Sequence, residues 1–143
     1  MRKKGFTLIE LLIVVAIIGL VLSFGVTTDI NTLKGDTFQA EASTVVSILE
    51  RARSHAMANL FDTNYGVCYI EPNYIIFKGD TCTATDSELI PANTNIASHT
   101  LTTFPEKIVF ERLSGRTTTA TIHLRHGVNE KTIEINYEGT INW

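Results

Sequence analysis

The sequence predicts an α+β protein in which a long N-terminal helix packs on an antiparallel β-sheet. Residues 6–26 form an apolar run, apolar residues then recur at helical spacing over residues 36–60, and the period changes toward two after residue 65. The chain has 143 residues, 44% of them apolar, which suits one folded core plus one appended element.

Residues 6–26 follow three basic residues, Arg2, Lys3 and Lys4. As a helix these 21 residues would reach roughly 30 Å, the thickness of a bilayer core, with the basic residues holding the N-terminus in the cytoplasm. A secretory signal peptide is the alternative, but the run is long for one, and Ser23-Phe24-Gly25 is a weak cleavage site. The pattern therefore favours a membrane helix over a removed signal.

Glu10 is the only charged side chain between Phe6 and Val26. An acidic residue at the centre of a membrane helix is unfavourable by about 2.5–3.5 kcal/mol on translocon scales, and such residues usually have a partner or a function. A plain membrane anchor therefore leaves Glu10 unexplained.

The segment GFTLIE at residues 5–10, between the basic leader and the apolar run, closely resembles the processing signal of type IV prepilins and type II secretion pseudopilins. The resemblance implies that prepilin peptidase cuts between Gly5 and Phe6 and that the new amine of Phe6 is methylated. Gly5 has no Cβ to obstruct a protease that needs extended backbone. In a helical stack, the carboxylate of Glu10 would pair with the Phe6 amine of the neighbouring subunit, where either charge alone is costly.

Residues 27–35 are polar and contain β-branched and turn-forming residues, which predicts a linker or hinge, with one uninterrupted helix as the alternative. Asp36 and Gln39 have the spacing of a capping box and predict the start of an amphipathic helix. The residues of its predicted apolar face are Phe38, Ala42, Val45, Val46, Leu49, Ala52, Ala56 and Leu60. The predicted solvated face carries Glu41, Glu50, Arg51, Ser54 and His55.

Strands are predicted from residue 65 onward. YGVCYIE and YIIFKG flank the turn signal Pro72-Asn73 and predict a hairpin. Residues 80–106 lack sustained periodicity and predict a long loop. KIVFERL, TTATIHL, KTIEINY and the short tail TINW predict further strands, so that a meander covers the apolar face of the helix.

The two cysteines, Cys68 and Cys82, form no C-x-x-C pair, so neither a zinc knuckle nor a dithiol redox motif is expected. One lies in a predicted strand and the other in the long loop. In a compartment that favours oxidation this arrangement predicts a disulfide between them, with two free thiols as the alternative.

The charge of the chain disfavours generic binding to nucleic acid. Its formal net charge is −3, and removing Arg2, Lys3 and Lys4 with the leader leaves 9 basic against 15 acidic residues, a net charge of −6. Counterion release requires several basic side chains gathered on one surface. Nucleic acid is therefore not expected among the partners.

The segments ERARSHAM, FERLSGRTTTATIHL and KTIEINYEGTINW resemble the GspH/FimT group of minor pilins and H-type pseudopilins. The positions that carry this resemblance are Arg53, Ala56, Gly115, Arg116 and Gly139. It implies a pilin-like fold, a long helix against an antiparallel sheet.

Some FimT-type members capture DNA through an arginine-bearing C-terminal Gly-Arg motif, which makes DNA capture the alternative function. Here the corresponding tail, EGTINW, has no arginine. The nearest basic residues, Arg112, Arg116 and Arg125, are expected to be offset by Glu106, Glu111 and Glu138. Trp143 could stack on a base, but packing of the C-terminal strand is the expected role.

Enzymatic activity is not expected. The chain has no G-x-S-x-G, H-E-x-x-H or G-x-x-x-x-G-K-[ST] motif, and no cofactor is implied. His123 and His126 are three residues apart, which in a strand places them on opposite faces, so no metal site is predicted. Ser114, before Gly115, is interpreted as a turn residue.

These observations predict a structural subunit, a minor pilin or pseudopilin, assembled through its N-terminal helix into a type IV pilus or type II secretion pseudopilus. Its predicted parts are a cleaved leader at residues 1–5, a hydrophobic assembly helix at 6–26, a linker at 27–35 and a periplasmic globular domain at 36–143. Its expected partners are prepilin peptidase, the inner membrane and other pilins. A monomeric, membrane-tethered binding module is the third alternative, and it leaves the GFTLIE motif as a coincidence.

Overall fold

The computed structural model describes the backbone of residues 7–24, 30–83 and 87–143, and the side chains of residues 7–21, 37–83 and 87–143. Contacts between residues divide the chain into two compact units, Met1–Lys34 and Gly35–Trp143. The first is called the N-terminal unit and the second the globular unit, and each is described by itself.

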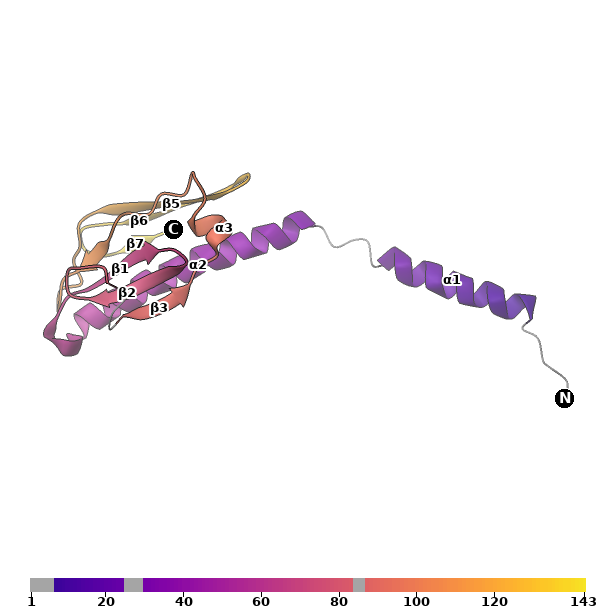
Figure 1. The fold of residues 1–143 in the computed structure, drawn as a ribbon, viewed down its shortest axis with the longest axis horizontal. Helices are drawn as coiled ribbons and strands as arrows, with labels where there is room; N and C mark the ends of the chain where they lie inside the picture. The colour runs from indigo at the N-terminus through magenta and orange to yellow at the C-terminus, as the bar shows by residue number, and fades with distance from the viewer. Residues whose placement is uncertain (1–6, 25–29, 84–86) are drawn as a thin grey trace. The chain divides into compact units, whose positions relative to one another are not determined.

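The N-terminal unit contains α1 (Leu8–Phe24) (Figure 1). Its first turn is closed by Thr7, whose carbonyl oxygen accepts the backbone N–H of Glu10 at 3.1 Å. The described side chains of α1 are all exposed. Among the described residues, no helix combines the length and the apolar character needed to cross a membrane. The helix predicted over residues 6–26 includes positions 6, 25 and 26, which lie outside the described residues.

α2 (Ile30–Met57) begins six residues before the predicted start at Asp36, so the predicted start was wrong. A capping box supplies partners for the first N–H groups of a helix but does not prevent a preceding turn from being helical. Gly35 inside a helix costs only about 1 kcal/mol relative to alanine. The predicted hinge at 27–35 lies partly outside the described residues, and its described part, residues 30–35, is helical.

The predicted apolar face of α2 is buried except at its last member. Leu60 lies beyond the helix, in the 3₁₀ turn η1 (Leu60–Asp62), and is 39% exposed. The prediction for Leu60 was wrong because α2 ends at Met57 and the chain turns at Asn59, whose backbone is left-handed with a φ of 51°. Ile48, which the sequence analysis did not select, is buried with the rest of the face.

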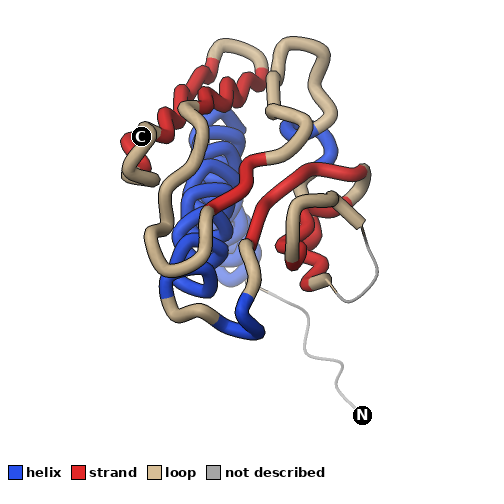
Figure 2. The backbone as a smooth tube through the Cα atoms, turned by 90° about the vertical axis from the view of Figure 1, so that its left-hand side faces the viewer, coloured by secondary structure: helices blue, strands red, loops and turns tan. Residues whose placement is uncertain are grey.

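The strands form two antiparallel sheets beside α2 (Figure 2). The first has the order β3-β2-β1-β4 and contains β1 (Tyr65–Ile70), β2 (Asn73–Lys78), β3 (Glu88–Pro91) and β4 (Ile108–Phe110). The second has the order β5-β6-β7 and contains β5 (Ala120–His126), β6 (Asn129–Ile135) and β7 (Ile141–Asn142). All named pairings are antiparallel, which confirms the predicted α+β fold class, a helix packed against antiparallel sheet.

Two features differ from the predicted meander. The strands divide into two sheets because the chain turns sharply after β4, where Leu113 and Gly115 have left-handed backbones with φ values of 63° and 64°. The predicted loop at residues 80–106 contains β3, paired with β2, and α3 (Thr94–Ala97). Both elements are only four residues long, which is too short to produce a recognisable period.

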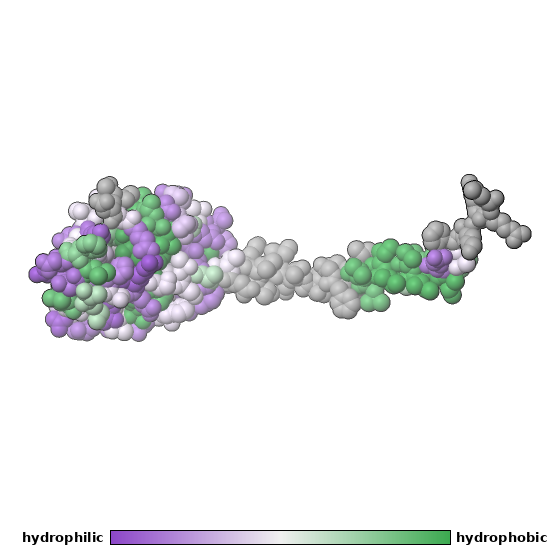
Figure 3. Space-filling view, turned by 90° about the horizontal axis from the view of Figure 1, so that it is seen from below, coloured by the Kyte–Doolittle hydropathy of each residue, from purple (hydrophilic) through white to green (hydrophobic). Residues whose placement is uncertain are grey.

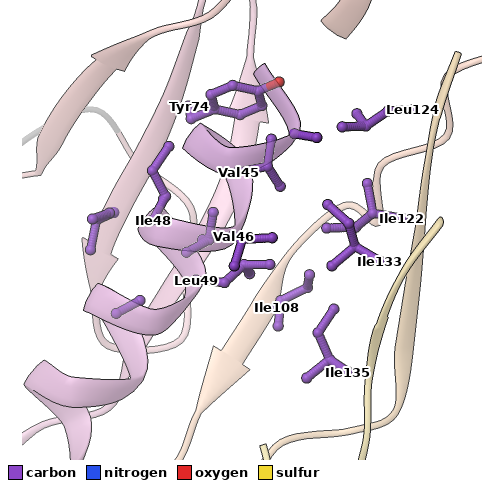
Figure 4. Close-up of a cluster of buried hydrophobic side chains, with 14 of the residues drawn as sticks. Val45, Val46, Ile48, Leu49, Tyr74, Ile108, Ile122, Leu124, Ile133 and Ile135 are labelled. Atoms are coloured by element: carbon purple, nitrogen blue, oxygen red, sulfur yellow. The ribbon is translucent and has the colours of Figure 1, made fainter. Parts of the chain in front are cut away.

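The core of the globular unit lies between α2 and both sheets. In Figure 4, Val45, Val46 and Leu49 of α2 face Ile108 of β4 and the side chains of β5 and β6. The members of this cluster from β5 and β6 are Ile122, Leu124, Ile133 and Ile135. Each fully buried aliphatic side chain contributes about 1.5–3 kcal/mol relative to exposure. The apolar face of α2 is therefore buried by strands of the same globular unit.

Candidate functional site

The predicted processing site lies at the N-terminus. Gly5 and Phe6 are outside the described residues, which begin at Thr7 in this part of the chain. The cleavage and methylation positions therefore stay sequence-based predictions.

Glu10 occupies the first turn of α1 and is exposed. A negative side chain at this end interacts favourably with the helix dipole. Within the described part of the chain, its carboxylate has no ion-pair partner. The geometry thus presents one carboxylate, without an intramolecular counter-ion among described residues, near the start of an apolar helix.

The other described side chains of α1 are apolar, and Figure 3 shows one face of this apolar surface. Large side chains exposed by half or more of their surface occur at successive positions around the helix: Leu8, Ile9, Leu11, Leu12, Ile13, Val14, Val15, Ile17, Ile18, Leu20 and Val21. A helix that is apolar all round is normally buried in a membrane or among other helices. The chemistry available to α1 is therefore helix association, with Glu10 as the one polar residue among its described side chains.

Cys68 and Cys82 form a disulfide, with their Cα atoms 6.2 Å apart. Cys68 lies in β1 and is fully buried, in a cluster with Ile75 and Phe77 of β2. The bridge attaches the segment after β2 to the first sheet. Its presence in the protein isolated from its host is tested below.

The arginines weighed for DNA capture all have acidic partners in the structure. Arg116 pairs with Glu138 at 3.5 Å and Arg125 with Glu130 at 3.3 Å. Arg112 pairs with Asp62. Of the three acids expected to offset these arginines, Glu106, Glu111 and Glu138, the last alone makes such a pair among the described residues. Arg112 and Arg116 pair with residues far from them in sequence, so these two partners depend on the tertiary fold.

Trp143 is half exposed and follows β7. The ammonium of Lys131 lies 4.9 Å from the centre of its ring. A cation at this distance stabilises the indole in place. One face of the ring is thus in contact with β6.

The two histidines of β5 do not converge on one site. His123 is exposed and its Nδ1 lies 3.2 Å from the hydroxyl of Thr132, while Nδ1 of His126 lies 3.2 Å from the carbonyl oxygen of Asn95. The ring of His126 contacts that of His99 instead, with ring centres 6.1 Å apart. Among the described residues, no group of three His, Cys, Asp or Glu side chains could hold a metal ion.

Glu41 was predicted on the solvated face of α2, and this was wrong because the residue is buried. Its Oε1 accepts the phenolic O–H of Tyr74 at 2.8 Å and the backbone N–H of Asn93 at 3.0 Å. Burial, followed by the hydrogen bond to Glu41, raises the pKa of Tyr74 above its ordinary value. The spacing did contain a signal, because Glu41 is three residues after Phe38 and four before Val45, both on the buried face.

The positions that carry the GspH/FimT resemblance meet at the C-terminal end of α2. Arg53 Nη2 donates to the carbonyl oxygen of Glu138 at 2.9 Å. Gly115 and Gly139 both have left-handed backbones, and a Cβ at Gly139 would overlap the carbonyl oxygen of Gly115. These residues attach the turns before β5 and β7 to α2, so the structure gives them a structural role.

Residues 1–26 match the family model of the prokaryotic N-terminal methylation motif. The comparison with curated proteins gave no match for the chain. The comparison with solved structures likewise gave no match.

The matched segment contains GFTLIE, with Glu10 as its last residue, and the whole of α1. Such a motif indicates a structural subunit of the pilin type. The N-terminal segment of this chain is therefore a type IV pilin-like prepilin signal.

Proposed function

We propose that this chain is a minor pilin or pseudopilin, inserted in the inner membrane as a single-pass prepilin with its globular unit in the periplasm. Prepilin peptidase cuts between Gly5 and Phe6, and Phe6 is N-methylated. The processed subunit enters a type IV pilus or a type II secretion pseudopilus through residues 6–26. The observation that carries this proposal is α1, an exposed and all-round apolar helix that lies within the methylation motif.

The apolar side chains described in α1 are exposed, so this surface requires an apolar environment. A bilayer provides one before assembly, and the helices of neighbouring subunits provide one in a fibre. When α1 moves from the bilayer to the fibre, it therefore stays in an apolar environment. This exchange is what a fibre built from membrane-inserted subunits requires.

Glu10 acts in this proposal as the residue that sets the register of assembly. Cleavage after Gly5 creates a positive amine on Phe6, and the carboxylate of Glu10 pairs with the amine of the neighbouring subunit. A buried ion pair adds little net stability, but breaking one by removing a partner costs about 3–5 kcal/mol. The pair therefore disfavours every register in which the two charges are apart.

Two features of the globular unit support the finer parts of the proposal. A disulfide is typical of proteins outside the reducing cytoplasm, which agrees with a periplasmic location. The junction of Arg53, Gly115 and Gly139 supports placement among GspH/FimT-like subunits, because it gives the matching positions a shared packing role. DNA capture has no such support, since Arg112, Arg116 and Arg125 are paired with acids.

Processing is tested by mass spectrometry of the protein from its native host. We expect the loss of Met1 to Gly5 and one additional methyl group on the new N-terminal Phe6. A mature N-terminus that still begins at Met1, or one near Val26, would contradict the proposal.

Assembly is tested by Glu10→Ala in the same host, with Ile9→Ala as a matched control on the same turn of α1. We expect Glu10→Ala to reach the membrane at least as well as the unaltered chain, because a charge has been removed. Its amount in sheared fibres should fall at least about tenfold, since the amine of the neighbour is left unpaired. Equal incorporation of both variants would mean that Glu10 has no role in assembly.

A further inference from the structure

The end of the globular unit where α2 terminates carries an exposed apolar patch, which we call the tip patch: Met57, Leu60, Phe61 and Leu113. Phe61 is 76% exposed and Leu113 is 63% exposed. Green apolar atoms are visible at this end, on the left of Figure 3. Large apolar side chains gathered in one exposed place indicate an interaction surface more often than scattered ones do.

The members of the tip patch come from the end of α2, from η1 and from the turn after β4, and hydrogen bonds connect these segments. Arg112 Nη1 donates to the carbonyl oxygen of Asp62 at 3.3 Å and also forms an ion pair with the Asp62 carboxylate. The backbone N–H of Leu113 donates to the carbonyl oxygen of Ala56 at 2.9 Å, in the last turn of α2. These bonds hold residues 60–62 and 112–113 at the same end of the unit.

The backbone of the tip patch is strained at two residues, and the large side chains of both are exposed. Phe61 and Leu113 have left-handed backbones, with φ values of 59° and 63°. For bulky residues without a polar side chain this conformation is a genuine outlier, and such outliers gather where function requires them. Apart from glycines, two more residues of the described chain have left-handed backbones, Asn59 and Asp62. Both lie within two residues of Phe61.

The size of the tip patch limits what can bind it. Its four side chains together expose on the order of 400 Å², taking about 150–250 Å² for a fully accessible large side chain. A free-standing interface needs about 800 Å² from each partner. The tip patch is too small to hold a soluble partner alone, but it suits a partner that is already held nearby by another contact, at an effective concentration in the millimolar range.

The charges around the tip patch indicate a protein partner and not an anionic surface. Arg112 is paired with Asp62, and the ammonium of Lys78 lies 4.1 Å from the centre of the Phe61 ring. Arg116, on the same loop as Leu113, is paired with Glu138. The contact with the Phe61 ring leaves the charge of Lys78 available, but lipid headgroups or nucleic acid would require several such basic side chains gathered on one surface.

We propose that the tip patch docks onto the globular unit of a neighbouring pilin-like subunit in the same fibre. This inference rests on the proposed function, because helix assembly supplies the second contact that the small patch needs. The neighbour presents an apolar surface that covers Phe61 and Leu113. Docking therefore determines which subunit follows this one, whereas α1 determines that it enters the fibre at all.

The first test is photo-cross-linking in the native host, with benzoylphenylalanine placed at position 61 of the full-length chain. The matched control position is Val128, which is fully exposed in the turn between β5 and β6. We expect fibre-associated protein to cross-link from position 61, and not from position 128, to a second subunit that carries a prepilin-type N-terminus. Cross-links to lipid, or none from position 61 in protein that co-sediments with fibres, would overturn the tip-patch proposal and leave the fibre function intact.

The second test separates docking from folding. Asparagine tolerates the left-handed backbone and removes the apolar surface, so Phe61→Asn with Leu113→Asn should leave the melting temperature unchanged or raise it. We expect normal processing but at least about a fivefold loss from sheared fibres, as for residues central to an interface. Val128→Asn should change neither quantity.

Two outcomes of the second test count against docking. A fall in melting temperature that accompanies the loss from fibres would mean that the side chains serve folding. Unchanged incorporation would exclude a docking role. If the unaltered chain is neither processed nor found in fibres, the proposed function fails first, and this inference fails with it.

Discussion

α1 and α2 are both long helices, but the apolar side chains of α2 are buried within the globular unit, whereas those described in α1 are exposed in the N-terminal unit. In α2, Leu49 and Ala52 are fully buried against strands, while polar residues occupy the opposite face. In α1, Leu12 and its apolar neighbours are exposed on all sides. The difference lies in the arrangement of apolar residues around the helix, since both segments adopt the same backbone structure.

The two helices therefore have different roles. The face of α2 completes the core of the globular unit, so its apolar residues contribute to the stability of the folded chain. The surface of α1 contributes nothing of this kind and must be covered by lipid or by other helices.

The strongest test replaces one leucine in each helix. Leu49→Ala should lower the free energy of unfolding of the globular unit by about 2–5 kcal/mol, because it leaves a cavity in a close-packed core. Leu12→Ala should leave that free energy unchanged. The measurement is denaturant unfolding of the full chain in detergent, followed by the fluorescence of Trp143, the one tryptophan of the sequence. Equal changes in the free energy of unfolding for the two substitutions would show that α1 and α2 do not differ in their contribution to stability.

The disulfide is a second contribution to the stability of the globular unit, separate from that of its apolar core. Replacing both Cys68 and Cys82 with alanine should lower the free energy of unfolding by about 3 kcal/mol, the loop-entropy value for a closed loop of about 15 residues. Thiol labelling of the unreduced, unfolded protein from its native host should find no free cysteine. Two labelled cysteines would show that the bridge does not form there.

The buried contact between Tyr74 and Glu41 offers a smaller effect. Tyr74→Phe removes the donor to Glu41 Oε1 and should cost about 1–3 kcal/mol, because a buried acceptor loses a partner. The same experiment on Glu50→Gln, at an exposed position of α2, should show no comparable loss. A neutral outcome for Tyr74→Phe would mean that Asn93 alone satisfies the carboxylate.

The same contact predicts a pH dependence. The pKa of Tyr74 is raised in the folded state, so the unfolded chain releases this proton first, near its ordinary value of about 10. The contribution of Tyr74 is therefore fully present below about pH 10 and is lost as the pH rises above it. Unfolding measured between pH 8 and pH 11, taken as about two units below and one above that value, should show a steeper decline for the unaltered protein than for Tyr74→Phe.

The smallest expected effect is on DNA. A fragment beginning at Gly35 should show no retardation of DNA at physiological salt and a protein concentration of about 10 μM, below the weak end of typical non-specific affinities. The paired arginines leave no concentrated positive field. Salt-sensitive binding that disappears when Arg112, Arg116 and Arg125 are replaced would instead support DNA capture.

Much of the fold could be predicted because its signals are local. The period of apolar residues identified α2, and alternating residues around Pro72 and Gly127 identified the hairpins. Errors arose where local signals were short or ambiguous. β3 has only four residues, and the capping pattern at Asp36 occurs inside a helix that was already formed. The burial of Glu41 was not predicted because its charge suggested a solvated position, although its spacing from Phe38 and Val45 placed it on the buried face.

The sequence by itself determined the prepilin signal and the all-round apolar character of α1, since both depend only on the order of neighbouring residues. It also determined the α+β class through its two periods. Only the tertiary structure decided the division into two sheets, the partners of Arg112 and Glu41, and the exposure of Phe61 and Leu113. These features depend on contacts between distant parts of the chain, such as the 50 residues that separate Asp62 from Arg112, and no local pattern specifies such a contact.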